Sequence, residues 1–196
     1  MISHPSTPNV TTRDPLPVAA VGRVVWITGL SGAGKSTLGR VVARRLREAG
    51  CPALILDGDE VRLAVADPAI AHDRASRLTN AMRICRFARL VAHQGFTVIV
   101  PTMSLFKEVF AWNRAHLPGY LEVWVKVPFE VLQARDARGL YSRAARGEAR
   151  HVAGIDLPFD EPESPHVILQ NDGAEAALEP LSDEILSRLT IPCQSH

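Results

Sequence analysis

The feature that most constrains the fold is a glycine-rich segment lying between an apolar run and a helical pattern. The apolar run Val24–Thr28 has the look of a buried strand, and helical periodicity extends from Lys35 to about Glu48. Between them the chain fits G-x-x-x-x-G-K-[ST] and reads Gly29-Leu30-Ser31-Gly32-Ala33-Gly34-Lys35-Ser36, followed by Thr37. Backbone N–H groups of such a loop converge on phosphate oxygens. We therefore predict that the segment binds ATP, with Lys35 at the β- and γ-phosphates and Ser36 on Mg²⁺.

Short apolar runs alternate with helical patterns along the rest of the chain. Strands are expected at Val24–Thr28, Ala53–Leu56, Phe96–Val100, Leu121–Val127 and His166–Leu169. Helices are expected at residues 35–48, 73–94, 105–116, 129–136 and 174–189. This order predicts an α/β protein with the P-loop kinase fold, a parallel five-stranded sheet with helices on both faces. Ligands of such sheets bind beyond the carboxyl ends of the strands.

Two segments lack this alternation of strands and helices, and they indicate the domain organisation. Residues 1–21 are rich in proline, serine and threonine, and we expect a disordered N-terminal arm there rather than a signal peptide. Residues 22–196 are expected to form one kinase domain. Within it, residues 138–163 interrupt the pattern with glycine, proline and charged residues. Loops of that length are usually functional or mobile, and the family resemblance described below implies that this one is a mobile lid.

Composition excludes several classes of protein. The chain has 196 residues, of which 46% are hydrophobic, and its formal net charge is +1. No overall positive field favours nucleic acid or a membrane surface as a partner, and no apolar run approaches the length of a membrane span. The three cysteines lie far apart and the histidines are dispersed, so neither a disulfide framework nor a zinc site is expected. We expect a cytoplasmic protein.

Two aspartates follow the second expected strand, at the edge of the sheet where the phosphate loop lies. Asp57 and Asp59 flank Gly58, which we expect to permit a sharp turn that brings both carboxylates together. One carboxylate can hold Mg²⁺ with Ser36, and the other can accept the proton of an attacking hydroxyl. We favour Asp57 for the metal and Asp59 as the catalytic base, although the pattern also allows the reverse assignment.

Several further blocks resemble the adenylyl-sulfate kinases, which use ATP to phosphorylate the ribose 3′-hydroxyl of adenosine 5′-phosphosulfate. These blocks are Leu56-Asp57-Gly58-Asp59-x-x-Arg62, Arg135-Asp136-x-Arg138-Gly139-Leu140-Tyr141, Ala145-Arg146-Gly147-Glu148 and Gly154-Ile155-Asp156-x-Pro158-Phe159. The resemblance covers about residues 22–190 and implies that Lys35, Asp57 and Asp59 are catalytic and that Arg135 binds ATP. It implies an acceptor-nucleotide site made by Asp59, Arg62, Arg77, Asn80, Thr102, Ser104, Arg138, Gly139, Leu140 and Asp156. It is also compatible with a homodimer, since ordinary members of the family are commonly dimers.

The acceptor side departs from the family pattern, whereas the phosphate loop does not. Ser76 replaces an acid, Thr102 begins a stretch that is usually Phe-Ile-Ser-Pro-Tyr-Arg, and Val152 replaces an aromatic residue expected to stack on the acceptor base. Two acceptors therefore stay open, namely adenosine phosphosulfate and another nucleotide such as cytidine diphosphoramidate. A nucleotide-binding switch without catalysis is a third interpretation, against which the retained Asp57 and Asp59 argue.

The helix expected at residues 73–94 links this acceptor site to the core. At about 100° per residue, Asn80, Ile84, Phe87 and Val91 fall on one stripe, which predicts that this stripe is buried. Arg77 lies at its edge and is expected to emerge into the cleft. Arg83 and Arg86 point elsewhere and are expected to be solvated.

Overall fold

The computed structural model describes residues 21–68, 73–136, 139–172 and 178–189. Its strands are β1 (Arg23–Thr28), β2 (Ala53–Ile55), β3 (Thr97–Pro101), β4 (Leu121–Lys126) and β5 (Val167–Gln170). Its helices are α1 (Lys35–Glu48), α2 (Gly58–Val65), α3 (Arg74–Ala92), α4 (Lys107–His116), α5 (Phe129–Arg135), α6 (Leu140–Ala145) and α7 (Leu178–Ser187). The predicted lid residue Arg138, most of the predicted N-terminal arm and the start of the last expected helix lie outside the described residues.

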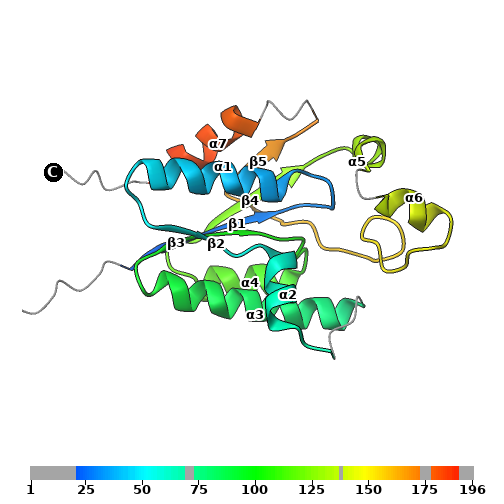
Figure 1. Cartoon of the computed structure of the whole chain (residues 1–196), viewed down its shortest axis with the longest axis horizontal. Helices are drawn as coiled ribbons and strands as arrows, with labels where there is room; N and C mark the ends of the chain where they lie inside the picture. The colour runs from blue at the N-terminus through cyan, green and yellow to red at the C-terminus, as the bar shows by residue number, and fades with distance from the viewer. Residues whose placement is uncertain (1–20, 69–72, 137–138, 173–177, 190–196) are drawn as a thin grey trace, which may run out of the picture.

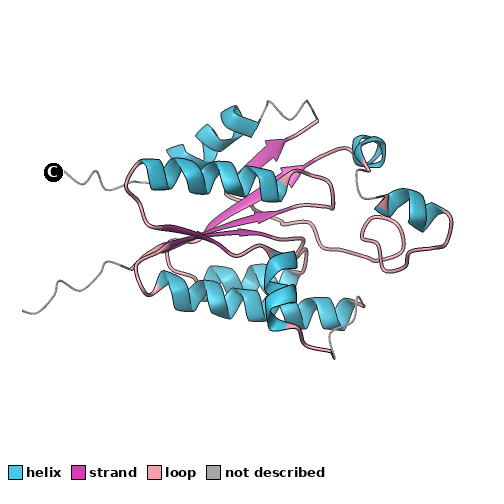
Figure 2. Cartoon of the chain, in the orientation of Figure 1, coloured by secondary structure: helices cyan, strands magenta, loops and turns pink. Residues whose placement is uncertain are grey.

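The strands form one parallel sheet in the order β2-β3-β1-β4-β5, as the alternation of strands and helices predicted. Helices α1 and α7 cover one face, and α2, α3 and α4 cover the other (Figures 1 and 2). The side chains of β1 alternate between the two faces because a strand has a period of two residues. Val25 and Ile27 pack in the cluster under α1 and α7, whereas Val24 and Trp26 pack in the cluster under α3.

The predicted strands and the long helices agree with the structure to within a few residues, but β3 runs one residue further than expected. Pro101 lies in the strand, opposite Ile27. Along β3 the backbone polar groups of successive residues point in turn to β2 and to β1, and those of residue 101 point to the β2 side. Strand β2 has already ended there, at Ile55. The proline therefore costs no ladder hydrogen bond, and the amide of Thr102 donates to the Ile27 carbonyl at 3.0 Å.

Two short helices were not predicted. Helix α2 begins directly at Gly58, where the sequence suggested only a turn, and Asp57 is its N-cap. Helix α6 lies inside the segment expected to be an irregular lid. We call residues 139–160, which include α6 and the loop after it, the lid segment.

The buried stripe predicted for α3 is wrong in one position. Phe87 is 42% exposed, while the buried face is formed by Asn80, Ala81, Ile84, Cys85, Ala88 and Ala92. Residues 81, 84, 85, 88 and 92 repeat at three and four positions, so the helix presents a face rotated away from Phe87. Arg83 is also more than a solvated arginine, since its guanidinium pairs with Asp67 at 2.6 Å.

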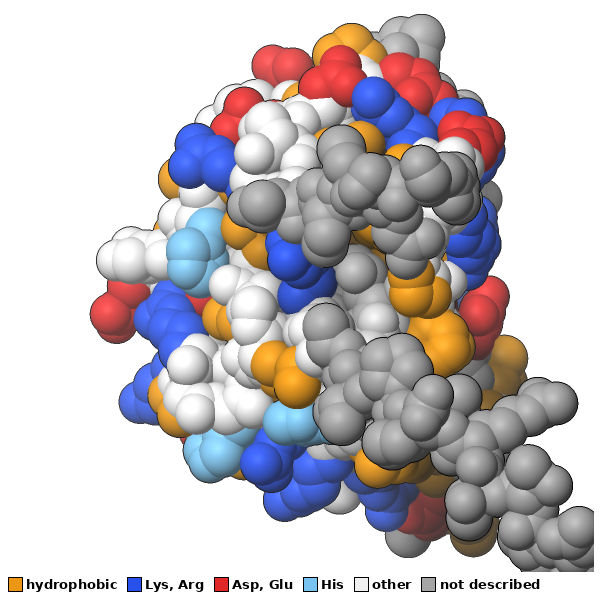
Figure 3. Space-filling model, turned by 90° about the vertical axis from the view of Figure 1, so that its left-hand side faces the viewer, with side chains coloured by type: hydrophobic (Ala, Val, Ile, Leu, Met, Phe, Trp, Pro, Cys, Tyr) orange, Lys and Arg blue, Asp and Glu red, His pale blue; other side chains and the backbone are white. Residues whose placement is uncertain are grey.

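The end of the molecule away from the carboxyl ends of the strands carries charges of both signs. Basic and acidic side chains are interspersed there among hydrophobic ones (Figure 3). Across the described ranges, every helix is too short or too polar to cross a bilayer.

Candidate active site

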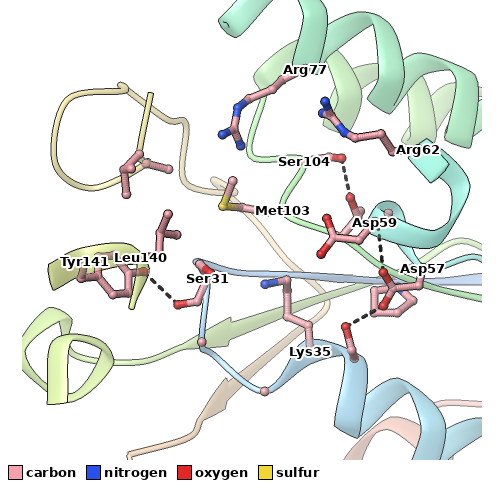
Figure 4. A pocket seen from close by; sticks show the side chains of 18 of the residues that line it. Ser31, Lys35, Asp57, Asp59, Arg62, Arg77, Met103, Ser104, Leu140 and Tyr141 are labelled. Atoms are coloured by element: carbon pink, nitrogen blue, oxygen red, sulfur yellow. Dashed lines mark hydrogen bonds between the residues drawn. The ribbon is translucent and has the colours of Figure 1, made fainter. Parts of the chain in front are cut away.

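A cavity of about 1070 Å³ opens beyond the carboxyl ends of the strands, where the sheet topology predicts the ligand site. The phosphate loop and α1 form one wall, α2 and α3 form the opposite wall, and the lid segment approaches from the side (Figure 4). The predicted site residues that line it are Ser31, Gly32, Gly34, Lys35, Ser36, Thr37, Asp57, Asp59, Arg62, Arg77, Asn80, Thr102, Ser104, Arg135 and Leu140.

The phosphate loop has the backbone geometry that its glycines suggested. Gly32 and Gly34 have φ values of +79° and +90°, in the left-handed region that favours glycine. A methyl group on Gly34 would also lie 2.8 Å from Nδ2 of Asn171. That buried amide donates to the Ala33 carbonyl at 2.9 Å and so braces the loop. The Lys35 ammonium group donates to the Leu30 carbonyl at 2.8 Å, across the mouth of the loop.

The acidic pair is joined to the loop by hydrogen bonds. Ser36 Oγ donates to Oδ2 of Asp57 at 2.6 Å, and Oδ1 of Asp57 accepts the amide of Asp59 at 2.9 Å. Asp57 is buried by these contacts, whereas the Asp59 side chain is exposed on the first turn of α2 and faces the cavity (Figure 4). The two carboxylates thus have different surroundings, which supports different roles for them.

The reason expected for Gly58 is wrong. It is the first residue of α2 and does not lie in the left-handed region, so no sharp turn requires it. A methyl group there would instead lie 2.7 Å from Oγ1 of Thr102. Glycine at this position lets α2 approach the segment after β3 closely.

The wall opposite the loop carries two arginines and two hydroxyl groups. Arg62 on α2 and Arg77 on α3 both line the cavity on the same side as Asp59 (Figure 4). Burial, and next the neighbouring charge of Arg62, lower the pKa of Arg77. Thr102 and Ser104 are both buried, and their hydroxyl oxygens lie 2.9 Å apart. Two guanidinium groups of like charge beside a carboxylate suit an anionic ligand that reaches Asp59.

The lid segment is ordered by two aspartates. Asp136 accepts the amides of Tyr141 and Ser142 at 3.0 and 2.8 Å at the start of α6. Asp156 accepts the amides of His151 and Val152 and closes the loop after α6.

Five described residues assigned to the nucleotides from sequence are not among the residues that line the cavity. Asp156 and Gly139 are not among the cavity-lining residues, since Asp156 bonds the lid backbone and Gly139 is the N-cap of α6. Gly29, Leu30 and Ala33 belong to the loop but do not line the cavity; Gly29 and Ala33 are buried, and Leu30 is half-buried.

The cavity also contains residues that the sequence interpretation did not assign to the site. Met103 and Phe106 follow β3, Arg143 and Arg150 come from the lid segment, and Asn171 directly follows β5. The position of Asn171 at the carboxyl end of a strand was a usable signal, because such positions face the ligand cleft. Met103 carries no comparable signal, since a methionine beside an apolar strand is ordinarily a core residue.

Comparisons with known proteins identify a family of kinases. The family model described as adenylylsulphate kinase matches residues 21–170. The adenylyl-sulfate kinase of Chloroflexus aurantiacus is 44% identical over 80% of this chain and 84% of its own. The cytidine diphosphoramidate kinase of Campylobacter jejuni is 35% identical over 86% of this chain and 96% of its own.

The fold comparison leads to the same group. The Mycobacterium tuberculosis APS kinase CysC, solved in complex with AMPPNP and APS, superposes with a TM-score of 0.79 at 34% identity, over 87% of this chain and 98% of that one. These relatives are kinases, so the chain is a phosphotransferase of the P-loop type. With the phosphate loop, the facing acidic pair and the family match all in place, the chain belongs to the adenylylsulphate kinase family.

Proposed function

We propose that the protein transfers the γ-phosphoryl group of ATP to the ribose 3′-hydroxyl of a nucleotide, with adenosine 5′-phosphosulfate as the first candidate acceptor. The observation that carries this proposal is the arrangement of the cavity, in which Lys35 on one wall faces Asp59 and two arginines on the other (Figure 4). A donor phosphate chain on the loop and an anionic acceptor on Arg62 and Arg77 would meet in front of Asp59.

The proposed transfer uses these residues as follows. The acceptor hydroxyl oxygen forms a bond to the γ-phosphorus, the bond from that phosphorus to the bridging oxygen breaks, and ADP leaves. The Asp59 carboxylate accepts the hydroxyl proton. Lys35 and the loop amides stabilise the charge on the transferred group. Lid residues such as Leu140 exclude water, which would otherwise compete as the acceptor.

The residues at the loop also suit a magnesium ion. The Ser36 hydroxyl and the Asp57 carboxylate lie within 2.6 Å of each other, and both are oxygen ligands of the kind that Mg²⁺ prefers. We propose that Ser36 and Asp57 hold the ion, directly or through water. When bound there, Mg²⁺ supplies positive charge to the β- and γ-phosphate oxygens.

A second acceptor, cytidine diphosphoramidate, is favoured by the wall of the cavity nearest the lid. Val152 and Ala153 are buried and line the cavity, where the family pattern leads one to expect an aromatic ring. Without that ring, a stacking contribution of about 1 kcal/mol to a bound purine is lost. The relative from Campylobacter jejuni, named for this acceptor, matches over 96% of its length.

Purified protein with ATP and Mg²⁺ tests the proposal against both acceptors side by side. We expect saturable ADP release with one of them, and loss of turnover in Lys35→Ala and Asp59→Asn while both variants stay folded. Lys126→Ala is the matched control and should keep its turnover, because Lys126 does not line the cavity. Its Nζ instead lies 4.6 Å from the centroid of the Trp124 ring. Near-normal turnover in Lys35→Ala would refute the mechanism, and turnover of adenosine phosphosulfate alone would end the second candidate.

A further inference from the structure

The lid segment rests on the phosphate loop through a buried tyrosine. Tyr141 on α6 is 4% exposed, and its hydroxyl donates to the Ser31 carbonyl at 2.8 Å (Figure 4). Its ring packs edge-on against Phe129 with centroids 5.4 Å apart. Burial raises the pKa of Tyr141 to about 12, so the hydroxyl keeps its proton at neutral pH and acts as the donor.

The carbonyl that accepts this bond belongs to a peptide unit of the phosphate loop. The Ser31 C=O and the Gly32 N–H lie in one rigid plane and point in opposite directions, because the peptide bond is planar and trans. When the carbonyl is directed at Tyr141, the Gly32 N–H is therefore directed away from the lid segment. Ser31 and Gly32 both line the cavity. Two contacts thus favour the same orientation of this peptide. One is the hydrogen bond from the Tyr141 hydroxyl to the Ser31 carbonyl, and the other is a bond from the Gly32 N–H to a phosphate oxygen.

The other end of the lid segment reaches the acceptor wall. Arg77 Nη2 donates to the His151 carbonyl at 2.9 Å, and Asp156 holds the amides of His151 and Val152. His151 has a φ of +59°, a conformation that a non-glycine residue keeps only when its surroundings fix it. The same segment therefore bonds the donor loop at Tyr141 and presents Val152 to the acceptor part of the cavity.

We propose that Tyr141 is a positioning residue that couples the binding of ATP phosphates to the position of the lid segment. The coupling acts through the Ser31–Gly32 peptide and does not require Tyr141 to touch either nucleotide. This inference rests on the proposed function in one respect, namely that ATP is the ligand of the loop. The acceptor's identity does not enter it.

Hydrogen exchange read by mass spectrometry tests the coupling on the full chain, with and without the non-hydrolysable analogue AMPPNP and Mg²⁺. In the unsubstituted protein we expect the analogue to slow exchange both in the loop and in residues 140–157. In Tyr141→Phe, the loop stays protected while the added protection of the lid segment falls about fivefold, the factor that one net hydrogen bond is worth. The dissociation constant of the analogue rises by the same factor, because coupling is reciprocal.

Tyr120→Phe is the matched control, since it removes the same hydroxyl group from the other of the two tyrosines, which is not a cavity-lining residue. It should leave the protection of the lid segment by AMPPNP unchanged. Equal acceleration of exchange in Tyr141→Phe with and without AMPPNP would overturn the proposal, because it would show a merely structural role. Absence of loop protection in the unsubstituted protein would instead overturn ATP binding itself, and the two failures are thus distinguishable.

Discussion

Replacement of Arg114 should destabilise the fold more than any ordinary surface substitution. Its partner Glu122 on β4 is completely buried, and the guanidinium bonds both carboxylate oxygens, with Nε 3.0 Å from Oε2 and Nη2 3.2 Å from Oε1. The backbone amide of Glu122 donates to Nδ1 of His166 at 2.9 Å. Glu122 lies near the amino end of its strand, away from the cavity, so the effect should fall on stability rather than on catalysis.

The magnitude follows from what each side chain loses. Removing one member of a buried ion pair costs about 3–5 kcal/mol because the other charge is left buried. The Arg114 side chain is 38% exposed, so water reaches the remaining carboxylate and we expect the lower end of that range, about 3 kcal/mol. For a chain of this size that corresponds to a fall in Tm of roughly 6–12 °C. In Glu122→Gln the buried charge itself is removed, so we expect the free energy of unfolding to fall by only about 1 kcal/mol.

The pH dependence gives a second readout. Burial raises the pKa of the Glu122 carboxyl group above its usual 4.5, while Arg114 opposes the shift. The folded state therefore binds this proton more tightly than the unfolded state, and stability falls as the pH rises from the unfolded pKa through the raised folded one. Without Arg114 the folded pKa rises further, so Arg114→Ala should lose stability over a wider pH range above 4.5.

Urea unfolding of the two single variants and the double variant measures this coupling. We expect Arg114→Ala with Glu122→Gln to be more stable than Arg114→Ala alone, with a coupling energy of about 2 kcal/mol. Additive free energies of unfolding, or a loss below about 1 kcal/mol in Arg114→Ala, would refute the reasoning.

Three further outcomes are expected. Ala66 ends α2 with a φ of +46°, so Ala66→Gly should raise the free energy of unfolding by about 1 kcal/mol in thermal or urea unfolding. Gly58→Ala places a methyl group 2.7 Å from Thr102 Oγ1, and turnover should fall about ten- to a hundredfold while AMPPNP affinity is kept. Burial raises the pKa of the Cys85 thiol to about 12, so iodoacetamide at pH 8 should modify Cys51 but spare Cys85 until the protein is unfolded, as read by mass spectrometry.

The sheet and its order of elements could be predicted because the short apolar runs alternate regularly with helical patterns along the chain. Glycine or proline follows three of the five expected strands, and the helices between them have clear ends. Helix α2 was missed even though its signals were present. Asp57 is an N-cap and Glu60 stands three residues later, which is the spacing of a capping box. The apolar pattern of an eight-residue helix is too short to compete with the turn signal of Asp57 and Gly58.

Helix α6 and the loop after it were beyond prediction for a different reason. The six residues of α6 are too few for a helix to form alone, and its first amides are held by Asp136, which belongs to the end of α5. Tyr141 then docks on Ser31, 110 positions earlier in the chain. Such contacts depend on the folded sheet and leave no periodic trace in the local sequence.

The two sides of the cavity differ in how well their binding groups can be predicted from the local sequence. The proposed donor side would bind phosphate mainly with consecutive backbone N–H groups, so the spacing of glycines with Lys35 and Ser36 describes nearly all of it. The acceptor side is assembled from side chains of separate segments, and its residues act only when the sheet has brought those segments together. Arg77 illustrates the consequence. An arginine in a cavity suggests that it binds an anion, yet one N–H group of Arg77 donates to the His151 carbonyl of the lid segment. Substituting Arg77 would therefore disturb the lid segment as well as the proposed acceptor site, and a change in acceptor affinity alone could not assign the role of Arg77.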